Sequence, residues 1–283
     1  MVSNYRLGLP AWAFPGWRGT VFNRSEDSLP QYSRVFNAVE GNTTFYAPPS
    51  AGKVACWKET LNGIDFKICF KLPQTVTHRR FPVWRDLSSL LQALEPLEPW
   101  LGPLLLQFPP TADHGDAGRL DQLRRRLPST WPRVVEWRDA SLYKSRAHLK
   151  AFLSTRTEQE NIVLMDANPL HNGDPTHPDV AGALHEKPAQ PNLELLLQQN
   201  PALPFMLRLV LHPEADSTAN ALETYAAQIS TVCDRYREVF VTVHCPNNLH
   251  CPAFARRFHD HLSAHRSVGS LPPWPLPQQE SLF

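Results

Sequence analysis

Leu104-Leu105-Leu106-Gln107 is a short apolar run that ends in a polar residue, and runs of this kind cross the whole chain. Buried parallel strands are near-continuous stretches of Val, Ile, Leu and Phe. The runs recur at intervals of about thirty residues, the length of a strand with its return helix. Eight are found, at residues 5–9, 37–40, 66–70, 104–107, 133–136, 162–166, 205–209 and 239–243. The pattern predicts an α/β fold, a single (β/α)₈ barrel of the TIM type.

Helical patterns fill the stretches between the runs. Residues 50–61 place Val54, Trp57 and Leu61 on one stripe, the spacing of a core-facing helix. Similar patterns cover residues 28–36, 87–100, 116–127, 143–154, 193–199, 220–236 and 252–265. Pro96 and Pro99 are expected to kink or end the helix over residues 87–100. The Pro-rich stretch 167–190 is predicted as an irregular loop over the barrel mouth. We expect residues 1–265 to form one barrel domain and residues 266–283 a Pro-rich tail.

Composition excludes several classes of protein. The net charge of +1 gives no general attraction for nucleic acid or acidic membranes, so any such contact requires a local patch. Five scattered cysteines, no apolar stretch of about 20 residues, and an N-terminus that enters the first predicted strand directly indicate a reduced cytoplasmic protein. No glycine-rich nucleotide loop and no G-x-S-x-G elbow occurs, which argues against dinucleotide oxidoreductases and serine hydrolases.

Three carboxylates follow or end predicted strands. Glu40, Glu136 and Asp166 lie at the ends of the second, fifth and sixth runs. The carboxyl ends of barrel strands share one rim, where barrel enzymes place their chemistry. We therefore predict that the three converge as catalytic acid–base residues. The alternative is that Glu40 and Glu136 pair with nearby cations and only hold the barrel together.

Those cations form a second part of the predicted site. Lys71, Arg138 and Arg208 belong to the same rim, and the planar fork of Arg suits a carboxylate or a phosphate. Three cations predict an anionic ligand, and internal ion pairing with the carboxylates is compatible with it. Further candidate substrate-binding residues at strand ends or in the loops that follow are Asn42, Tyr46, His78, Gln107, His212 and His244.

A metal site is the main alternative chemistry. His78, His212 and His244 together with the carboxylates would suit zinc, manganese or iron, which drive phosphoester hydrolysis or sugar isomerisation. The His-Cys doublets at 244–245 and 250–251 lack a standard zinc spacing. We assign no metal ligands from the sequence, and a divalent metal stays as an alternative cofactor.

Five ordered sequence blocks resemble one known family. Residues 39–46 with Pro48-Pro49-Ser50 resemble the E-x-N-[ST]-T-F-Y-x-x-P-S block of the YecE-like family, the "domain of unknown function 72" proteins. The other matching blocks are residues 66–71 with Thr77-His78, residues 101–110, residues 135–138, and Leu207-Arg208-Leu209 with His212. The resemblance spans roughly residues 5–260 and implies a TIM-type barrel, without supplying an established reaction.

The chain departs from the family pattern in its first and last blocks. Residues 8–12 read Gly-Leu-Pro-Ala-Trp where the family has G-x-S-G-W. The last run continues into His244-Cys245-Pro246 where the family has an aromatic residue and two asparagines. Roles carried over by resemblance therefore do not extend to these two loops.

The C-terminal residues carry a separate signal. Gln279-Glu280-Ser281-Leu282-Phe283 follows a Pro-rich tether and resembles the Q-x-[SD]-L-F peptide by which bacterial polymerases and repair proteins dock on the DNA sliding clamp. We predict that Gln279, Leu282 and Phe283 bind such a partner. The alternative is that Leu282 and Phe283 fold back onto the barrel.

Three hypotheses for function remain open. The first is an enzyme, a phosphoesterase, lyase or isomerase, acting on a phosphate-containing sugar or nucleic-acid-derived substrate. The second is a metal-dependent phosphoesterase or endonuclease-like repair protein recruited to the sliding clamp. The third is a non-catalytic ligand-binding adaptor. Metal content separates the first two, and loss of activity without unfolding after removal of the Glu136 carboxylate separates an enzyme from an adaptor.

Overall fold

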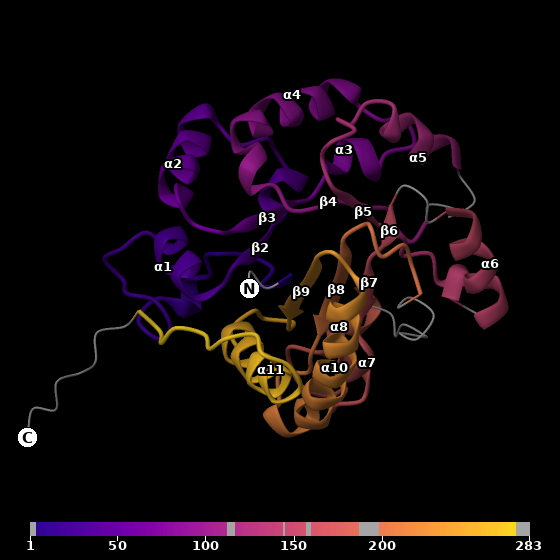
Figure 1. The fold of residues 1–283 in the computed structure, drawn as a ribbon. Coiled ribbons are helices and arrows are strands. Elements are labelled where there is room, and N and C mark those ends of the chain that lie inside the picture. The colour runs from indigo at the N-terminus through magenta and orange to yellow at the C-terminus, as the bar shows by residue number, and fades with distance from the viewer. Residues whose placement is uncertain (1–3, 112–116, 144, 157–159, 187–197, 276–283) are drawn as a thin grey trace, which may run out of the picture.

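The computed structural model describes residues 4–275 except 112–116, 144, 157–159 and 187–197. It has a mixed α/β fold in which parallel strands lie centrally and helices lie outside them (Figure 1). Each predicted run contains a strand, and the sixth is divided at Val163. The strands are β1 (Tyr5–Gly8), β2 (Ala38–Gly41), β3 (Lys67–Phe70), β4 (Leu104–Gln107), β5 (Arg133–Glu136), β6 (Asn161–Ile162), β7 (Leu164–Asp166), β8 (Phe205–Val210) and β9 (Val239–His244).

The strands form three parallel sheets, ordered β1-β9-β8-β7, β2-β3 and β4-β5-β6. Backbone contacts also link strands of different sheets. The Glu40 N–H donates to the Leu9 carbonyl at 3.0 Å, which joins β2 to the end of β1. An isolated bridge pairs Lys71 with Leu105 and joins β3 to β4. The strand order therefore follows the chain order from sheet to sheet.

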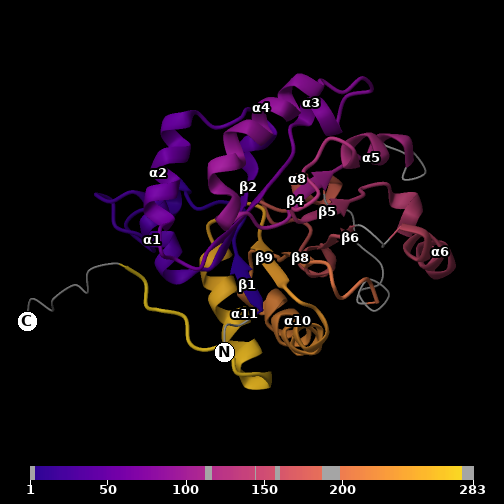
Figure 2. The ribbon, with the colours of Figure 1, turned by 45° about the horizontal axis from the view of Figure 1, so that its top comes forward.

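Helices surround the strands (Figure 2). The α-helices of the described chain are α1 (Ser28–Val35), α2 (Ala51–Leu61), α3 (Gln74–Thr77), α4 (Trp84–Leu94), α5 (Ala117–Arg124), α6 (Arg146–Arg156), α7 (Asn168–His171), α8 (Ala181–Glu186), α10 (Ala215–Arg235) and α11 (Cys251–His265). None of these helices is both long enough and apolar enough to cross a membrane.

The prolines end the helix predicted for residues 87–100, as expected. α4 ends at Leu94, and Pro96 and Pro99 lie in the 3₁₀ segment η3 (Glu95–Trp100), because proline lacks the N–H that a continuing α-helix requires. One prediction about irregular structure needed correction. The stretch 167–190, predicted as irregular, contains α7 and α8. Pro169 lies in the first turn of α7, where proline is tolerated. The helix predicted for residues 193–199 falls almost wholly outside the described residues.

Side chains alternate between the two faces of each strand. One face carries a buried cluster to which β2, β3, β4, β5, β8 and β9 each contribute one residue and the β6–β7 segment another: Ala38, Cys69, Leu105, Val134, Met206, Phe240 and Val163. The opposite face packs into a larger core shared with the helices. Because side chains repeat with a period of two, the residues two positions further along share the inner face. These residues are Glu40, Lys71, Gln107, Glu136, Met165, Arg208 and Thr242.

The hydroxyl of Tyr32 ties α1 to the first two strands. Tyr32 is fully buried, accepts a hydrogen bond from the Leu9 N–H at 2.8 Å and donates one to the Ala38 carbonyl at 2.8 Å. Both backbone groups lie near the junction of β1 and β2. The single hydroxyl therefore satisfies two buried polar groups at the point where these strands meet.

The described part of the C-terminal tail packs on the domain. The Trp274 ring lies 6.1 Å from the Phe36 ring and 4.2 Å from the Arg256 guanidinium. Arg256 also donates to the carbonyls of Leu271 and Pro272, at 3.3 and 2.6 Å. The tail is therefore held against α1 and α11 as far as Trp274, whereas the sequence predicted a free tether after residue 265. Gln279, Leu282 and Phe283 lie outside the described residues.

We expect Tyr32→Phe to lower the free energy of unfolding by about 2 kcal/mol, because two buried backbone groups lose their partner. Urea denaturation measures the change. Tyr46→Phe is the matched control, since Tyr46 is 74% exposed, and we expect a change within about 0.5 kcal/mol. Equal stability of the two variants would contradict the role given to the Tyr32 hydroxyl.

Candidate functional site

Arg208 is the centre of a buried ionic cluster at the carboxyl ends of the strands. Its Nε donates to Glu40 Oε1 at 2.9 Å, and its Nη2 donates to Glu40 Oε2 at 3.1 Å. Its Nη1 donates to Glu136 Oε2. The Arg208 side chain is 7% exposed and each glutamate 1% exposed. Because these residues come from β8, β2 and β5, one guanidinium joins all three sheets.

The carboxylate oxygens of Glu40 and Glu136 also accept hydrogen bonds from other side chains. Glu40 Oε1 accepts from the Thr242 hydroxyl and lies 2.9 Å from His244 Nε2, and Glu40 Oε2 accepts from Asn42 Nδ2 at 3.3 Å. Arg138 Nε donates to Glu136 Oε1 at 2.7 Å. Every carboxylate oxygen of the pair thus has a donor. His244 joins the cluster although the chain departs from the family pattern there.

Both glutamates are ionised at neutral pH. Burial opposes ionisation of Glu40, but the charge of Arg208 and the hydrogen bond with His244 hold its pKa well below the ordinary value. Burial likewise opposes ionisation of Glu136, and Arg208 and Arg138 lower its pKa to about 2. A carboxylate this acidic is a poor proton donor at neutral pH. The pair therefore serves chiefly to hold cations.

Lys71 and His78 form a half-buried layer beside this cluster. Lys71 Nζ lies 3.8 Å from the centre of the Phe45 ring, and the His78 ring meets the same ring edge-on at 4.9 Å. Burial and the charge of Arg208 lower the pKa of Lys71 to about 8. Burial and the charge of Lys71 lower the pKa of His78 to about 4, so His78 is neutral at pH 7. At pH 7, Lys71 is therefore mostly protonated, and the neutral His78 ring adds no second positive charge beside it.

The cluster carries a surplus of positive charge. Two carboxylates, Glu40 and Glu136, face the cations Arg208, Arg138 and Lys71, and Lys71 makes no ion pair in the described chain. Gln107, at the end of β4 on the same strand face, is 2% exposed, and its Oε1 has no hydrogen-bond partner in the described chain. The site thus offers an excess cation and an unused acceptor, the two features that bind an anionic group and a hydroxyl or amino group.

Asp166 does not join the other two carboxylates. It accepts hydrogen bonds from the Tyr225 hydroxyl at 2.6 Å and from the Asn168 N–H at 2.9 Å, and burial raises its pKa. The cause is strand alternation. Met165, one position earlier, faces the cluster, and its Sδ lies 3.7 Å from Arg138 Nη2. Asp166 consequently faces the helices and fastens α10 to β7.

His212 and Tyr46 also lie apart from the cluster. His212 is fully buried; its Nε2 lies 3.0 Å from the Asp174 carbonyl, and its Nδ1 accepts from the Glu214 N–H. Its polar atoms are engaged in holding the segment that follows α7 against the end of β8. Tyr46 is exposed, and its ring lies edge-on to Phe45. Of the predicted residues, the structure brings together Glu40, Asn42, Lys71, His78, Gln107, Glu136, Arg138, Arg208 and His244.

Two members of the site escaped the sequence-based prediction. Thr242 lies two residues before His244 on the same strand face, so period-two counting from His244 would have found it. Phe45 was noted only as one of several nearby aromatic residues. Outside the site, the three consecutive arginines 124–126 would by themselves indicate a solvated face, but Arg124 pairs with buried Glu160 at 2.6 Å and with Asp121 at 2.8 Å.

The donor set does not fit a metal ion. Within the described residues, no group of three or more His, Cys, Asp or Glu side chains is arranged to hold one. The carboxylate oxygens of Glu40 and Glu136 are instead engaged by guanidinium and other donors. The expected metal alternative therefore has no ligand set in this part of the chain.

Comparison with known proteins assigns the family. The family model described as "Protein of unknown function DUF72" matches residues 6–279, and the chain belongs to this family. The UPF0759 protein YecE of Escherichia coli K12 is 27% identical over 284 residues, covering 98% of this chain and 99% of that protein. This confirms the resemblance found in the sequence blocks.

Solved structures of the family share the fold. A DUF72 family protein from Enterococcus faecalis V583 superimposes with a TM-score of 0.68 at 18% identity, covering 96% of this chain and all of that one. A DUF72 family protein from Thermotoga maritima MSB8 gives a TM-score of 0.64 at 20% identity, covering 92% of this chain and 99% of that one. At these identities the similarity shows the fold alone.

We expect Arg208→Met to destabilise the protein by roughly 3–5 kcal/mol, because it leaves Glu40 and Glu136 buried without their shared cation. Urea denaturation at pH 7 measures the loss. Arg34→Met is the matched control: the Arg34 side chain is 62% exposed and lies 3.8 Å from Glu26, so we expect a change below about 1 kcal/mol. Similar losses in both variants would contradict the central position of Arg208.

Proposed function

We propose that the three sheets close into one (β/α)₈ barrel of the TIM type formed by residues 1–265, with residues 266–283 as a tail. The parallel strands, the Glu40–Leu9 hydrogen bond and the Lys71–Leu105 bridge support closure, since each joins strands of different sheets. In such a barrel the ionic cluster occupies the carboxyl-end mouth, which is where barrel enzymes bind substrate.

We propose further that this protein is an enzyme acting on an anionic small molecule that carries a phosphate, a sugar phosphate or a nucleic-acid-derived compound. The observation that carries this proposal is the surplus cation. The positive charge of Arg208 is paired with two carboxylates. Lys71, in contrast, makes no ion pair in the described chain, and the Arg138 side chain is 19% exposed and can reach a ligand. An ammonium and a guanidinium at one site suit a phosphate group.

Each residue of the cluster receives a role. Lys71 and Arg138 bind the anionic group. Asn42 and the unused Gln107 oxygen orient hydroxyl or base groups by hydrogen bonding. Glu40 and Glu136 stay ionised and position Arg208. These roles differ from the acid–base assignment expected of the carboxylates.

Lys71 is the group best suited to move a proton. Its pKa of about 8 lies near neutral pH, where a general acid or base works best. Proton transfer beside a bound phosphate is the chemistry of isomerases and lyases, and we favour this class over phosphoester hydrolysis.

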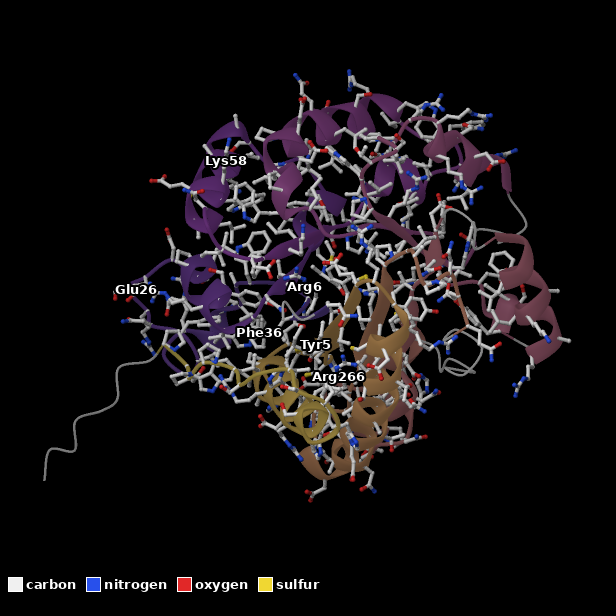
Figure 3. All side chains as sticks on the ribbon, in the orientation of Figure 1. Tyr5, Arg6, Glu26, Phe36, Lys58 and Arg266 are labelled. Carbon is white, nitrogen blue, oxygen red and sulfur yellow. The ribbon has the colours of Figure 1, made fainter. Side chains whose placement is uncertain are left out.

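We expect inorganic phosphate to bind wild type and to bind Lys71→Met at least about tenfold more weakly, since one positive charge is lost. Titration calorimetry measures the affinity. It should fall as pH rises through about 8, because the ammonium of Lys71 in the unliganded protein loses its proton there, and Lys71→Met should lose this dependence. Lys58→Met, on the outer surface of α2 (Figure 3), is the matched control. Phosphate binding that ignores Lys71 refutes the assignment.

We also propose that residues Gln279, Leu282 and Phe283 dock on the DNA sliding clamp. The anchoring of Trp274 by Phe36 and Arg256 supports this proposal, because it holds the chain on the domain shortly before Gln279 and gives the peptide a defined attachment point. Deletion of residues 279–283 should then abolish clamp binding in surface plasmon resonance while leaving phosphate binding intact. Undiminished clamp binding by the truncated protein would show that Gln279, Leu282 and Phe283 are not the docking residues.

A further inference from the structure

The helices α3, α4 and α5 lie on one side of the fold (Figure 2), and they and the loops beside them carry several basic and aromatic side chains. We call this set of side chains the basic–aromatic strip and define it by Tyr46, Arg79, Arg80, Phe81, Arg119 and Arg126. We propose that this strip binds single-stranded nucleic acid. The proposal goes beyond the small-molecule site and does not depend on it.

The first observation is the exposure of two aromatic rings. Phe81 is 79% exposed and Tyr46 is 74% exposed, far more than Ile64 or Leu249, the other exposed large apolar residues of the described chain. Tyr46 lies in the segment after β2, and Phe81 lies after α3 in the segment that follows β3, the strand paired with β2. Solvent-exposed aromatic rings beside cations are the platforms on which unpaired bases stack.

The second observation is uncompensated charge. Residues 66–85 contain five Lys or Arg and no Asp or Glu, and residues 41–58 also lack acidic side chains. Arg79, Arg80 and Arg126 make no ion pair within the described residues. This local concentration of positive charge is the patch that a chain of net charge +1 needs in order to bind a polyanion.

The third observation is that two cations of the strip are held by contacts with neighbouring elements. Arg119 donates to the carbonyls of Thr77 and Arg80 at 3.2 and 3.3 Å, which joins α5 to the loop after α3. The Arg126 guanidinium lies 4.1 Å from the centre of the Trp84 ring, which joins the end of α5 to the start of α4. Arg119 and Arg126 are therefore held in place before any ligand arrives, which reduces the entropy lost on binding.

Stacking selects the single-stranded form of the ligand. Bases in a duplex already stack on one another and present only their edges, whereas the bases of a single strand can cover Phe81 and Tyr46. An acidic peptide would use the cations and leave the rings uncovered. The exposed rings therefore favour nucleic acid over an acidic protein.

Fluorescence anisotropy with labelled (dT)12 and (rU)12 tests the proposal, and the two probes distinguish DNA from RNA. We expect the full-length protein to bind at least one, with affinity falling with salt at a logarithmic slope near −3 for four phosphate contacts. Arg80→Ala/Arg126→Ala should reduce the slope by about 1.4. Tyr46→Ala/Phe81→Ala should weaken binding about tenfold without changing the slope.

Controls separate this strip from the rest of the surface. Arg34→Ala removes an exposed cation and Leu249→Ala an exposed apolar side chain elsewhere, and both should bind the oligonucleotides as wild type does. All strip variants should keep the phosphate affinity of the small-molecule site, so failure of either proposal is visible separately.

Three results overturn the proposal. The first is that neither oligonucleotide binds the wild-type protein. The second is that binding is unchanged in Arg80→Ala/Arg126→Ala. The third is that polyglutamate binds as tightly as the oligonucleotides and the ring variants behave as wild type, which identifies a site for acidic protein instead.

Discussion

One guanidinium, that of Arg208, constrains the rest of this structure. It is the buried cation that two carboxylates from different sheets share, and its own sheet supplies the third attachment. A buried ion pair is weak evidence of net stability, because desolvation offsets the attraction. Its geometry, however, tolerates few alternatives, since each charge is costly to bury without the others. The network therefore specifies how β2, β5 and β8 are placed relative to one another.

This arrangement separates the site into two layers with different chemistry. In the buried layer, Arg208 pairs with both Glu40 and Glu136, and the two carboxylates stay ionised across the physiological pH range. In the half-buried layer, Lys71 packs on the Phe45 ring, and the neutral His78 ring contacts the same Phe45 ring edge-on. The charges of the buried layer stay fixed beside the titratable ammonium of Lys71. This is a form of electrostatic preorganisation, because the buried charges need no reorientation for Lys71 to bind an anion.

Many of the strands were predictable because buried strands consist of apolar residues and so appear as apolar runs in the sequence. Each apolar run contains a strand, and the interpretation of Glu40 and Glu136 as partners of Arg208 was available from residue types alone. Which face a residue occupies was harder to predict. Asp166 ends its run as Glu136 does, yet the side chains at the two positions face opposite ways, and only the strand register decides this.

Long-range contacts account for the other differences. The burial of Arg124 depends on Glu160, 36 residues away in the sequence. The attachment of the tail depends on Phe36, at the end of α1, whose ring contacts Trp274. Neither contact has a local signal in the sequence. Tyr46 and Phe81 were equally ambiguous, because an aromatic residue after a strand is usually packed, and only their exposure identifies them as surface rings.

The alternation of side chains along the strands has a consequence for how this family can change its length. One residue inserted within β8 before Arg208 would turn the guanidinium toward the helices and leave two buried carboxylates without it. Substitution at the strand ends can alter ligand preference, but a change in strand length disables the cluster in a single step. Insertions and deletions that keep this cluster intact are therefore expected in the loops, where they do not shift the register of β2, β5 or β8.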